Sequence, residues 1–403
     1  MRIIFVTGLY PKQNLEYYRN NVKGDSLQYA ANEFQWRILE GMFHNRVDIH
    51  VLSLPFLPCY PSYAKLRTDN SNIYYDKITV GKTISYCTLP IVKEFSMKFR
   101  LRKELISYCR QYRDETIYIL TYNSSGFMQE VVRPLKKKYT IKLCSIITDL
   151  IDDATNPVFK LSFAKYVQAK LEQIRRKKSY DYTDGFILLS KHMTEKIPQA
   201  SNKNIIVEGI AKSNVSHSIK LKDSRIKSIL YTGTLAEFSG VRNLVDAFMR
   251  IGNPDYRLVV CGIGELSEYI SSCALKDNRI QHMGVVSHER AIALQNDAIL
   301  LVNPRLPSVS LTKYSFPSKT IEYLLSGTPM IGYKLEGIPD EYFKYIYTPK
   351  DYSIESLSDL IECVLNKSSV ELYQRALSAR EFILNNKSSI KHVEKIISFV
   401  TQL

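Results

Sequence analysis

Lys319 and Glu322 are the two residues whose types and spacing most clearly indicate chemistry in this chain. Lys319 falls in the first turn of a predicted helix, where the helix dipole makes a cation unfavourable by about 0.3 kcal/mol or more. Free N–H groups at a helix N-terminus, together with a lysine, form a phosphate site. Glu322 lies about 4.5 Å further along the helix axis, where its carboxylate can accept hydrogen bonds from the vicinal hydroxyls of a sugar. The pair therefore indicates a nucleoside diphosphate, although a surface i,i+3 ion pair worth about 0.2–0.5 kcal/mol explains the same two residues.

The helix that must position this pair is predicted to begin close to Pro317. Proline is tolerated near a helix start because its missing N–H would be unpaired there, and Ser315 is expected to cap the remaining donors. Three apolar residues then share one face of the helix: Ile321, Leu324 and Leu325. The segment Ser326-Gly-Thr-Pro329 ends the helix, and Met330-Ile331 begins a short strand. The stretch therefore predicts one helix–strand unit of a parallel α/β sheet.

The length of 403 residues predicts two domains, because one hydrophobic core rarely grows so large. We assign residues 1–205 to the first domain, residues 206–385 to the second, and residues 386–403 to a terminal helix. No apolar run reaches the roughly 18–20 residues that span a bilayer, and the segment Met1–Gly8 predicts a first strand, not a signal peptide. The seven cysteines are scattered without metal-binding spacing, which favours reduced thiols in the cytosol.

The N-terminal half is predicted to be an α/β domain with polar turns at the carboxyl ends of its strands. Predicted strands cover residues 2–7, 47–53, 116–121, 141–147 and 184–190, and predicted helices include one near Tyr29–Trp36 and one over Phe95–Arg113. The turn after residues 141–147 contains Asp149, with Asp152 and Asp153 close behind it. Asp149 is a candidate site residue, with a loop-capping carboxylate as the alternative. No metal site is expected at these three carboxylates, because further ligands are not identifiable.

Strands and helices alternate more clearly in the C-terminal half. Strands are predicted at 228–232, 256–261, 279–283 and 298–302, and each is followed by a turn. Three of these turns contain glycine, and the series is typical of a second doubly wound domain.

Several segments of this half resemble glycosyltransferase family 4, and they occur in the order found in that family. They are Tyr231-Thr-Gly-Thr-Leu235, Gly262-Ile-Gly-Glu265, His282-Met-Gly-Val-Val286, Phe316–Ile331 and Glu336–Glu341. The resemblance implies the α/β GT-B fold, with two doubly wound Rossmann-like domains facing across a cleft and a final helix that crosses back to the first domain. It also implies retaining, metal-independent sugar transfer from a nucleotide-sugar, for which we expect UDP.

The resemblance also implies which residues bind the donor. Gly233, Thr234 and Gly264 would lie near the diphosphate, the backbone of Val285 would meet the nucleobase, and Ser318, Lys319 and Glu322 would bind phosphate and ribose. Gly24 corresponds, less specifically, to a loop of the first domain near the donor phosphates. Tyr314 stands where the family usually has a glutamate that contacts the transferred sugar.

Two further departures affect the expected chemistry. The family's Arg and Lys in the loop after the first donor-domain strand are absent here, where the loop contains Thr234 and Ser239. Arg305 and Lys319 are therefore the candidates to balance the diphosphate charge. A histidine that many members have in the first domain is also absent, which is why Asp149 is the candidate there. Catalytic roles are thus assigned to Asp149, Lys319 and Arg305.

The net charge of +15 indicates an anionic partner. Residues 93–142 contain twelve Lys or Arg against five Asp or Glu, and the predicted helix over Phe95–Arg113 is basic and amphipathic, with Phe95 and Phe99 near its start. Such a helix can dock on an anionic membrane, while a core-packed helix with a solvated basic face is the alternative.

We therefore expect a glycosyltransferase that transfers a sugar to a lipid-linked or saccharide acceptor in surface polysaccharide assembly, such as capsule or lipopolysaccharide. The protein is expected in the cytoplasm, peripherally on the inner face of the cell membrane, with no cofactor. The alternatives are a catalytically impaired GT-B protein that binds nucleotide-sugar, a nucleotide-sugar epimerase, and a nucleic-acid-binding protein. The last is disfavoured, because no nucleic-acid-binding module is recognisable.

Overall fold

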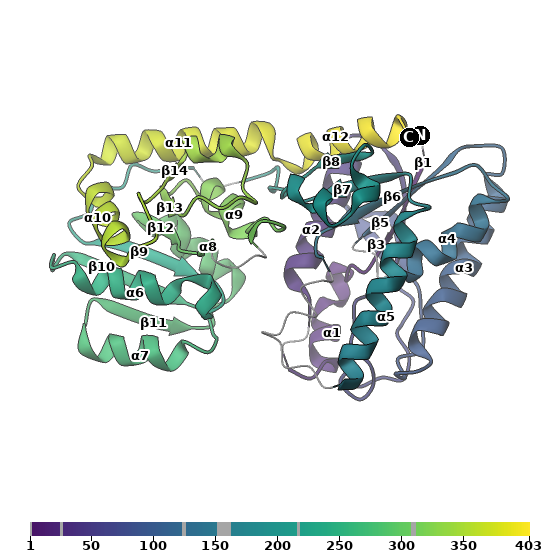
Figure 1. Ribbon diagram of the computed structural model, residues 1–403, viewed down its shortest axis with the longest axis horizontal. Coiled ribbons are helices and arrows are strands. Elements are labelled where there is room, and N and C mark those ends of the chain that lie inside the picture. Colours follow the sequence, from purple (N-terminus) through teal and green to yellow (C-terminus); the bar gives the residue numbers. More distant parts are fainter. Residues whose placement is uncertain (1, 25–26, 123–125, 151–162, 216–217, 308–311) are drawn as a thin grey trace. The chain divides into compact units, whose positions relative to one another are not determined.

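A computed structural model describes the chain except for residues 1, 25–26, 123–125, 151–162, 216–217 and 308–311, and the side chains of 163–169 (Figure 1). The chain forms two compact units. The N-terminal unit contains Met1–Ile210 and Ser389–Leu403, and the C-terminal unit contains Ala211–Ser388. Each is an α/β unit built on a sheet whose strands are mostly or wholly parallel, as the sequence predicted.

The N-terminal unit has an eight-stranded sheet in the order β3-β4-β2-β1-β5-β6-β7-β8. Neighbouring strands are parallel except for the antiparallel pair β3–β4. The strands are β1 (Arg2–Thr7), β2 (Asp48–Ser53), β3 (Asn72–Tyr75), β4 (Ile78–Thr83), β5 (Ile117–Tyr122), β6 (Ile141–Ile147), β7 (Gly185–Leu188) and β8 (Asn204–Ile206). The helices are α1 (Leu15–Asn21), α2 (Tyr29–His44), α3 (Lys93–Gln111), α4 (Phe127–Lys136), α5 (Phe163–Tyr180) and α12 (Ser389–Thr401).

Two parts of this sheet differ from the sequence prediction. The β3–β4 hairpin was not predicted, since its four- and six-residue strands carry no regular apolar alternation and are half exposed. Strand β8 was also not predicted, and it pairs with β7 in parallel through Phe186–Asn204, Ile187–Ile205 and Leu188–Ile206. It has only three residues, all partly exposed, which leaves no clear strand pattern in the sequence.

The C-terminal helix α12 packs against α2 within the N-terminal unit. Val393, Ile396 and Val400 are buried in one cluster with Ile38 and Met42. Gly41 permits this close contact, since a Cβ at that position would lie 2.3 Å from the carbonyl oxygen of Ser389 and 2.4 Å from the Val393 side chain. The last 15 residues of the chain thus complete the core of the unit that contains its first strand.

The C-terminal unit has a six-stranded parallel sheet in the order β11-β10-β9-β12-β13-β14. The strands are β9 (Lys227–Thr232), β10 (Tyr256–Cys261), β11 (Ile280–Gly284), β12 (Leu300–Asn303), β13 (Met330–Gly332) and β14 (Ile346–Tyr347). The helices are α6 (Val241–Arg250), α7 (Ser267–Lys276), α8 (His288–Asp297), α9 (Ser318–Ser326), α10 (Ile354–Leu365) and α11 (Ser369–Asn386).

The strand order places a topological switch point between β9 and β12. From β9 the chain proceeds outward to β10 and β11, and from β12 it proceeds in the other direction to β13 and β14. The loops that leave β9 and β12 therefore diverge at the carboxyl edge of the sheet, which is where open α/β sheets bind ligands.

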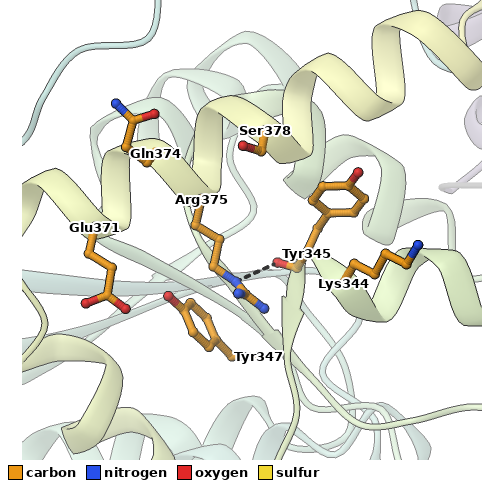
Figure 2. Close-up of a pocket in the computed structure, with 7 residues that line it drawn as sticks. All are labelled: Lys344, Tyr345, Tyr347, Glu371, Gln374, Arg375 and Ser378. Carbon is orange, nitrogen blue, oxygen red and sulfur yellow. Dashed lines mark hydrogen bonds between the residues drawn. The ribbon is translucent and has the colours of Figure 1, made fainter.

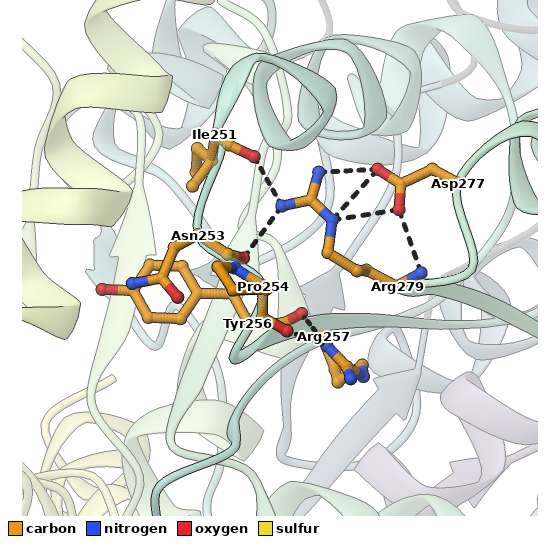
Figure 3. A network of polar contacts seen from close by, with 7 residues as sticks. All are labelled: Ile251, Asn253, Pro254, Tyr256, Arg257, Asp277 and Arg279. Atoms are coloured by element: carbon orange, nitrogen blue, oxygen red, sulfur yellow. Dashed lines mark hydrogen bonds and ion pairs between the residues drawn. The ribbon is translucent and has the colours of Figure 1, made fainter.

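Arg279 stabilises the opposite, amino edge of this sheet (Figure 3). Its guanidinium forms a 2.6 Å ion pair with Asp277 and donates hydrogen bonds of 2.5 Å to the Ile251 carbonyl and 2.9 Å to the Asn253 carbonyl. The start of β11 is thereby fixed to the end of α6 and to the loop before β10. Both charged side chains are largely buried, and each has its partner.

Among the described residues, no helix has the length and apolar character needed to cross a membrane.

Candidate functional site

Helix α9 begins and ends close to the predicted residues, but its N-terminus is capped differently. Pro317 is the N-cap residue, and no side chain of the described residues caps the helix. Ser315 was predicted to be the cap, and this is wrong, because its hydroxyl accepts a 3.5 Å hydrogen bond from the Arg305 guanidinium. Gly327 ends the helix in the left-handed conformation, as expected for a C-terminal glycine. The first turn of α9 is thus left without a side-chain cap, which is a property of helix N-termini that bind anions.

Lys319 and Glu322 form the i,i+3 ion pair that the alternative interpretation expected, with Nζ and Oε1 2.8 Å apart. Glu322 differs from a surface residue, however, because Gln295 of α8 also donates a 2.5 Å hydrogen bond to the same carboxylate oxygen. Burial alone would raise the pKa of Glu322, but Lys319, Gln295 and the charge of His288 outweigh it and lower that pKa. Glu322 is therefore held as a carboxylate in a fixed orientation.

Tyr323 anchors α9 to the end of β9. Its buried hydroxyl accepts a 2.8 Å hydrogen bond from the backbone N–H of Thr232 and lies 3.1 Å from the Thr232 hydroxyl. Gln295 donates a 3.1 Å hydrogen bond to the same Thr232 hydroxyl. These contacts fix the first turns of α9 against the switch point. The roles of Thr232 and Gln295 were not predicted from the sequence. The only pattern that could have indicated Gln295 is a polar residue on the buried side of α8.

Arg305, in the loop after β12, is a half-buried cation that is not paired with a carboxylate among the described residues. Its Nη2 donates the 3.5 Å hydrogen bond to Ser315, and its buried Nε has no hydrogen-bond partner in the part of the chain that the structure describes. Burial lowers the pKa of Arg305, which Tyr231 opposes only in part. A half-buried, incompletely bonded guanidinium at the switch point is suited to an anionic ligand.

The glycine turns of this edge pack closely on one another. Gly240 has a φ of +71°, and a Cβ there would lie 1.9 Å from the Pro304 carbonyl oxygen, so the loops after β9 and β12 touch. Gly262 has a φ of +144°, and a Cβ there would lie 1.8 Å from the Gly233 carbonyl oxygen. Gly240 and Gly262 therefore permit the packing of neighbouring loops, while the approach of Gly233 to a diphosphate stays a prediction.

The remaining predicted donor residues lie on the same loops. The Thr234 side chain is exposed, while its carbonyl accepts hydrogen bonds of 2.8 Å from both the Tyr231 and the Ser239 hydroxyl. The Gly264 N–H donates a 3.1 Å hydrogen bond to the Ser267 hydroxyl, so this amide is already used within the loop. Val285 is exposed at the end of β11, and Tyr314 is half buried between β12 and α9. The contacts of Gly264 favour a part in shaping the loop.

Two basic residues near the site, His288 and Arg290, were not predicted. The charge of His288 contributes to lowering the pKa of Glu322, and the charges of Arg290 and Lys319 both oppose the rise that burial causes in the pKa of Cys261. Both new residues belong to the first turn of α8 and are exposed. The carboxyl edge thus carries several positive groups, which suits a ligand with more than one negative charge.

Asp149 and Gly24 belong to the N-terminal unit. Asp149 is exposed after β6, accepts a 3.0 Å hydrogen bond from the Thr148 hydroxyl, and receives a 2.9 Å hydrogen bond at its carbonyl from Arg176 of α5. Gly24 has a φ of +67° and open space where a Cβ would lie. The predicted neighbours Asp152 and Asp153 lie outside the described residues. Within the described ranges, no cluster of three or more His, Cys, Asp or Glu side chains could hold a metal ion.

A separate surface hollow of about 310 Å³ lies at the junction of β14 and α11 (Figure 2). Arg375 closes it by donating hydrogen bonds of 3.3 Å and 3.4 Å to the Tyr345 and Ile346 carbonyls, with its guanidinium carbon 4.0 Å from the centre of the Tyr347 ring. The hollow includes none of the predicted site residues.

Residues 226–367, which include β9, α9 and the loops between them, match the family model described as "Glycosyl transferases group 1". No curated protein sequence matches the chain.

The whole chain resembles several solved structures. Sucrose-phosphate synthase from Thermosynechococcus elongatus is 14% identical, with 100% of this chain and 99% of that chain covered and a TM-score of 0.65. The Anabaena protein Alr3699/HepE in complex with UDP is 12% identical, with 100% of both chains covered and a TM-score of 0.59. The lipopolysaccharide outer core galactosyltransferase WaaB, in its apo form, is 12% identical, with coverages of 100% and 99% and a TM-score of 0.59. At these identities the likeness establishes the fold, which is that of GT-B glycosyltransferases with two Rossmann-like domains.

Proposed function

We propose that the protein is a glycosyltransferase that transfers a sugar from a nucleoside-diphosphate sugar, with UDP as the expected nucleotide, to a lipid-linked or saccharide acceptor. The observation that carries the proposal is the polar site at the switch point of the C-terminal unit. Its support is the start of α9, where Lys319 and Glu322 form an ion pair, and the half-buried Arg305 in the loop after β12, whose Nε has no hydrogen-bond partner among the described residues. The match of residues 226–367 to a glycosyltransferase family model supports it independently.

On the donor side, the two cations have different tasks. Arg305 is fixed and partly desolvated, so its interaction with a diphosphate is strengthened by the low local polarity. Lys319 must exchange its 2.8 Å contact with Glu322 for a phosphate oxygen. Glu322 then remains held by Gln295 at 2.5 Å and can accept hydrogen bonds from the ribose hydroxyls. Gly233, Thr234, Ser318 and the Val285 backbone complete the proposed donor contacts.

In the proposed reaction, the bond between the anomeric carbon of the sugar and the diphosphate oxygen breaks, and a bond from that carbon to an acceptor hydroxyl oxygen forms. The acceptor proton leaves with a base, and the released nucleoside diphosphate carries the extra negative charge. That charge develops at the leaving oxygen, which the start of α9, Lys319 and Arg305 would stabilise. We further propose that transfer retains the anomeric configuration and needs no metal, by the same family resemblance.

On the acceptor side, Asp149 is the proposed positioning group, because it is exposed at the carboxyl edge of its own sheet and its backbone is fixed by Arg176. The proposed setting is the cytoplasm, in assembly of surface polysaccharide. All seven cysteines lie in the described part of the chain and are free thiols, which suits a reducing compartment.

Tyr314 favours a second candidate, a protein that binds nucleotide-sugar without turnover. In the resembled family its position usually carries the glutamate that contacts the transferred sugar, and here a half-buried tyrosine occupies it. Release of nucleoside diphosphate from a bound nucleotide-sugar in the presence of a lipid extract distinguishes the two candidates, since only the transferase produces it.

The proposal is tested by thermal unfolding with UDP, GDP, CMP and dTDP added separately to the wild type and to Glu322→Ala. One nucleotide should raise the midpoint of the wild type, since ligand at about 100 times its Kd adds about 2.7 kcal/mol of stability. The rise should be lost in Glu322→Ala and kept in Glu371→Ala. Glu371, in the first turn of α11, is the matched control, because it also forms a close ion pair, at 2.6 Å with Lys367, and is not among the proposed donor residues. Equal shifts in wild type and Glu322→Ala, or no shift with any nucleotide, would contradict the proposal.

A further inference from the structure

Apolar side chains are exposed along the start of helix α3 and the turn before it. Ile91 is 85% exposed, Phe95 is 72% exposed and Phe99 is 68% exposed, and Val92 is also exposed beside them. Phe95 and Phe99 are four residues apart and share one face of α3, while Met97, Leu101 and Leu105 face the core. The phenylalanines therefore do not serve the core, and solvent exposure of two phenyl rings is unfavourable without a partner.

Helix α5 has a similar outer face. Leu171 and Ile174 are 59% and 52% exposed, and Lys170, Lys177 and Lys178 are exposed on the same side of the helix. The spacing of these five residues is i, i+1, i+4, i+7 and i+8, which is one helical stripe. The stripe combines aliphatic side chains with lysines and contains no acidic residue.

Cations also continue the apolar face of α3. Arg102, Lys103 and Arg110 are exposed further along the helix. The acidic residues of the two helices instead take part in ion pairs. Glu104 pairs with Lys82 at 2.9 Å, and Glu94 pairs with Lys98 at 2.8 Å. The outward charge of both helices is therefore positive.

An ion-pair network joins the two helices into one surface. Arg175 of α5 contacts Glu94 of α3 at 2.6 Å and Glu130 of α4 at 3.3 Å, and Lys98 of α3 contacts Glu130 at 2.6 Å. Figure 1 shows α3, α4 and α5 on one side of the N-terminal unit. The exposed faces of α3 and α5 therefore belong to neighbouring, mutually fixed helices.

We propose that this α3–α5 surface, consisting of Ile91, Val92, Phe95, Phe99, Leu171, Ile174 and the exposed cations beside them, docks the protein on an anionic phospholipid bilayer. Apolar side chains that insert into the interface while Lys and Arg contact lipid phosphates are the pattern of proteins that lie on membranes. A second copy of the chain fits less well, because two such basic faces would repel one another. The core of a protein interface is also ordinarily depleted in lysine.

The position of the surface connects it with the proposed acceptor side. Helix α3 follows β4 and ends shortly before β5 begins, so its start with Phe95 lies at the carboxyl edge of the sheet. Asp149 lies at the same edge, and its carbonyl is bonded to Arg176 of α5. A bilayer on this surface would present a lipid-linked acceptor at that edge. This consequence for the acceptor rests on the proposed function, whereas the docking itself does not.

The test is sedimentation of the full chain with vesicles, without nucleotide or acceptor. Vesicles of phosphatidylcholine with about one-third phosphatidylglycerol should bind the wild type, and pure phosphatidylcholine should bind it much more weakly. Phe95→Ser/Phe99→Ser should weaken binding to the anionic vesicles at least about tenfold, because two phenyl rings no longer leave water. About 0.5 M salt should also weaken binding, since it screens the lysine and arginine contacts.

The matched control is Leu275→Ser/Val370→Ser, which removes two apolar side chains of the C-terminal unit that are 90% and 58% exposed. It should bind vesicles like the wild type. No binding of the wild type to anionic vesicles would overturn the proposal, as would equal losses in both variants. A dimer that is broken by Phe95→Ser/Phe99→Ser, without vesicle binding, would assign the surface to self-association. Because the assay contains no donor, its failure leaves the nucleotide shift unaffected, and the two proposals fail separately.

Discussion

The substitution Arg305→Met tests whether Arg305 serves ligand binding or the stability of the fold. The substitution retains much of the side-chain volume and removes the charge. Arg305 has one 3.5 Å hydrogen bond to Ser315 and an unbonded buried Nε among the described residues. Removing a half-buried cation without a carboxylate partner relieves a desolvation penalty, so the unliganded protein should be unchanged or more stable by up to about 2 kcal/mol.

Nucleotide binding should change in the opposite direction. Hydrogen bonds between charged groups contribute about 1.5–3 kcal/mol each, so losing one such contact to the diphosphate weakens binding by about 10–150-fold. Arg279→Met is the contrasting control in the same unit. It removes a 2.6 Å ion pair and two hydrogen bonds to carbonyls, and should destabilise the protein by about 3–5 kcal/mol while leaving nucleotide affinity unchanged.

The assays are chemical denaturation without ligand and titration calorimetry with the nucleotide identified by thermal unfolding. We expect opposite effects in the two variants, with Arg305→Met losing affinity and Arg279→Met losing stability. If Arg305→Met lowers stability by more than about 1 kcal/mol and binds nucleotide as tightly as the wild type, Arg305 is a structural residue. In that case the proposed charge balance at the switch point is wrong.

Three other changes have defined outcomes. Lys319→Ala should lower the rate of nucleoside diphosphate release about a hundredfold with less effect on donor affinity, and a wild-type rate would exclude the lysine from the reaction. Gly240→Ala should cost at least about 2 kcal/mol of stability, because the φ of Gly240 is +71° and a Cβ there would lie 1.9 Å from the Pro304 carbonyl oxygen. The control Gly252→Ala should be nearly neutral, because a Cβ at Gly252 would lie in open space. Equal losses of stability in the two variants would contradict the packing argument. Burial raises the pKa of Glu172 to about 7, although the charges of two neighbouring arginines oppose the rise. The folded protein therefore keeps a proton that the unfolded chain releases near pH 4.5. Because the folded state binds this proton more tightly, the free energy of unfolding falls as the pH rises between these two values. Glu172→Gln should therefore be more stable than the wild type by about 1–3 kcal/mol at about pH 8 and equal to it near pH 4, and equal stability at both would refute the shift.

The sequence predicted best those elements whose pattern is local. Helix α9 and strand β13 follow from a proline, an apolar stripe and a terminal glycine within about 16 residues, and the central strands β1, β6, β9 and β10 follow from short apolar runs. The β3–β4 hairpin and β8 were not predicted, because short, half-exposed edge strands lack such a pattern.

The site was predicted less completely, because its contacts join distant residues. Gln295 contacts both Glu322 and Thr232, which are 27 and 63 positions away, and no local pattern links them. The Ser315 cap was wrong because Pro317, not Ser315, occupies the N-cap position, and the Ser315 hydroxyl instead accepts a hydrogen bond from Arg305, ten residues earlier. The glycines of the C-terminal half marked the positions of the loops correctly. The atoms closest to a Cβ at Gly240 and at Gly262 belong to neighbouring loops.

Amide hydrogen exchange of the full chain with saturating nucleotide tests the central claim most directly, since that claim places a nucleoside diphosphate at the first turn of α9. We expect slower exchange at residues 318–322 and in the loop 233–236 when nucleotide is bound, and no such change in Glu322→Ala. Protection confined to other segments, or exchange at 318–322 that nucleotide leaves unchanged, would contradict it.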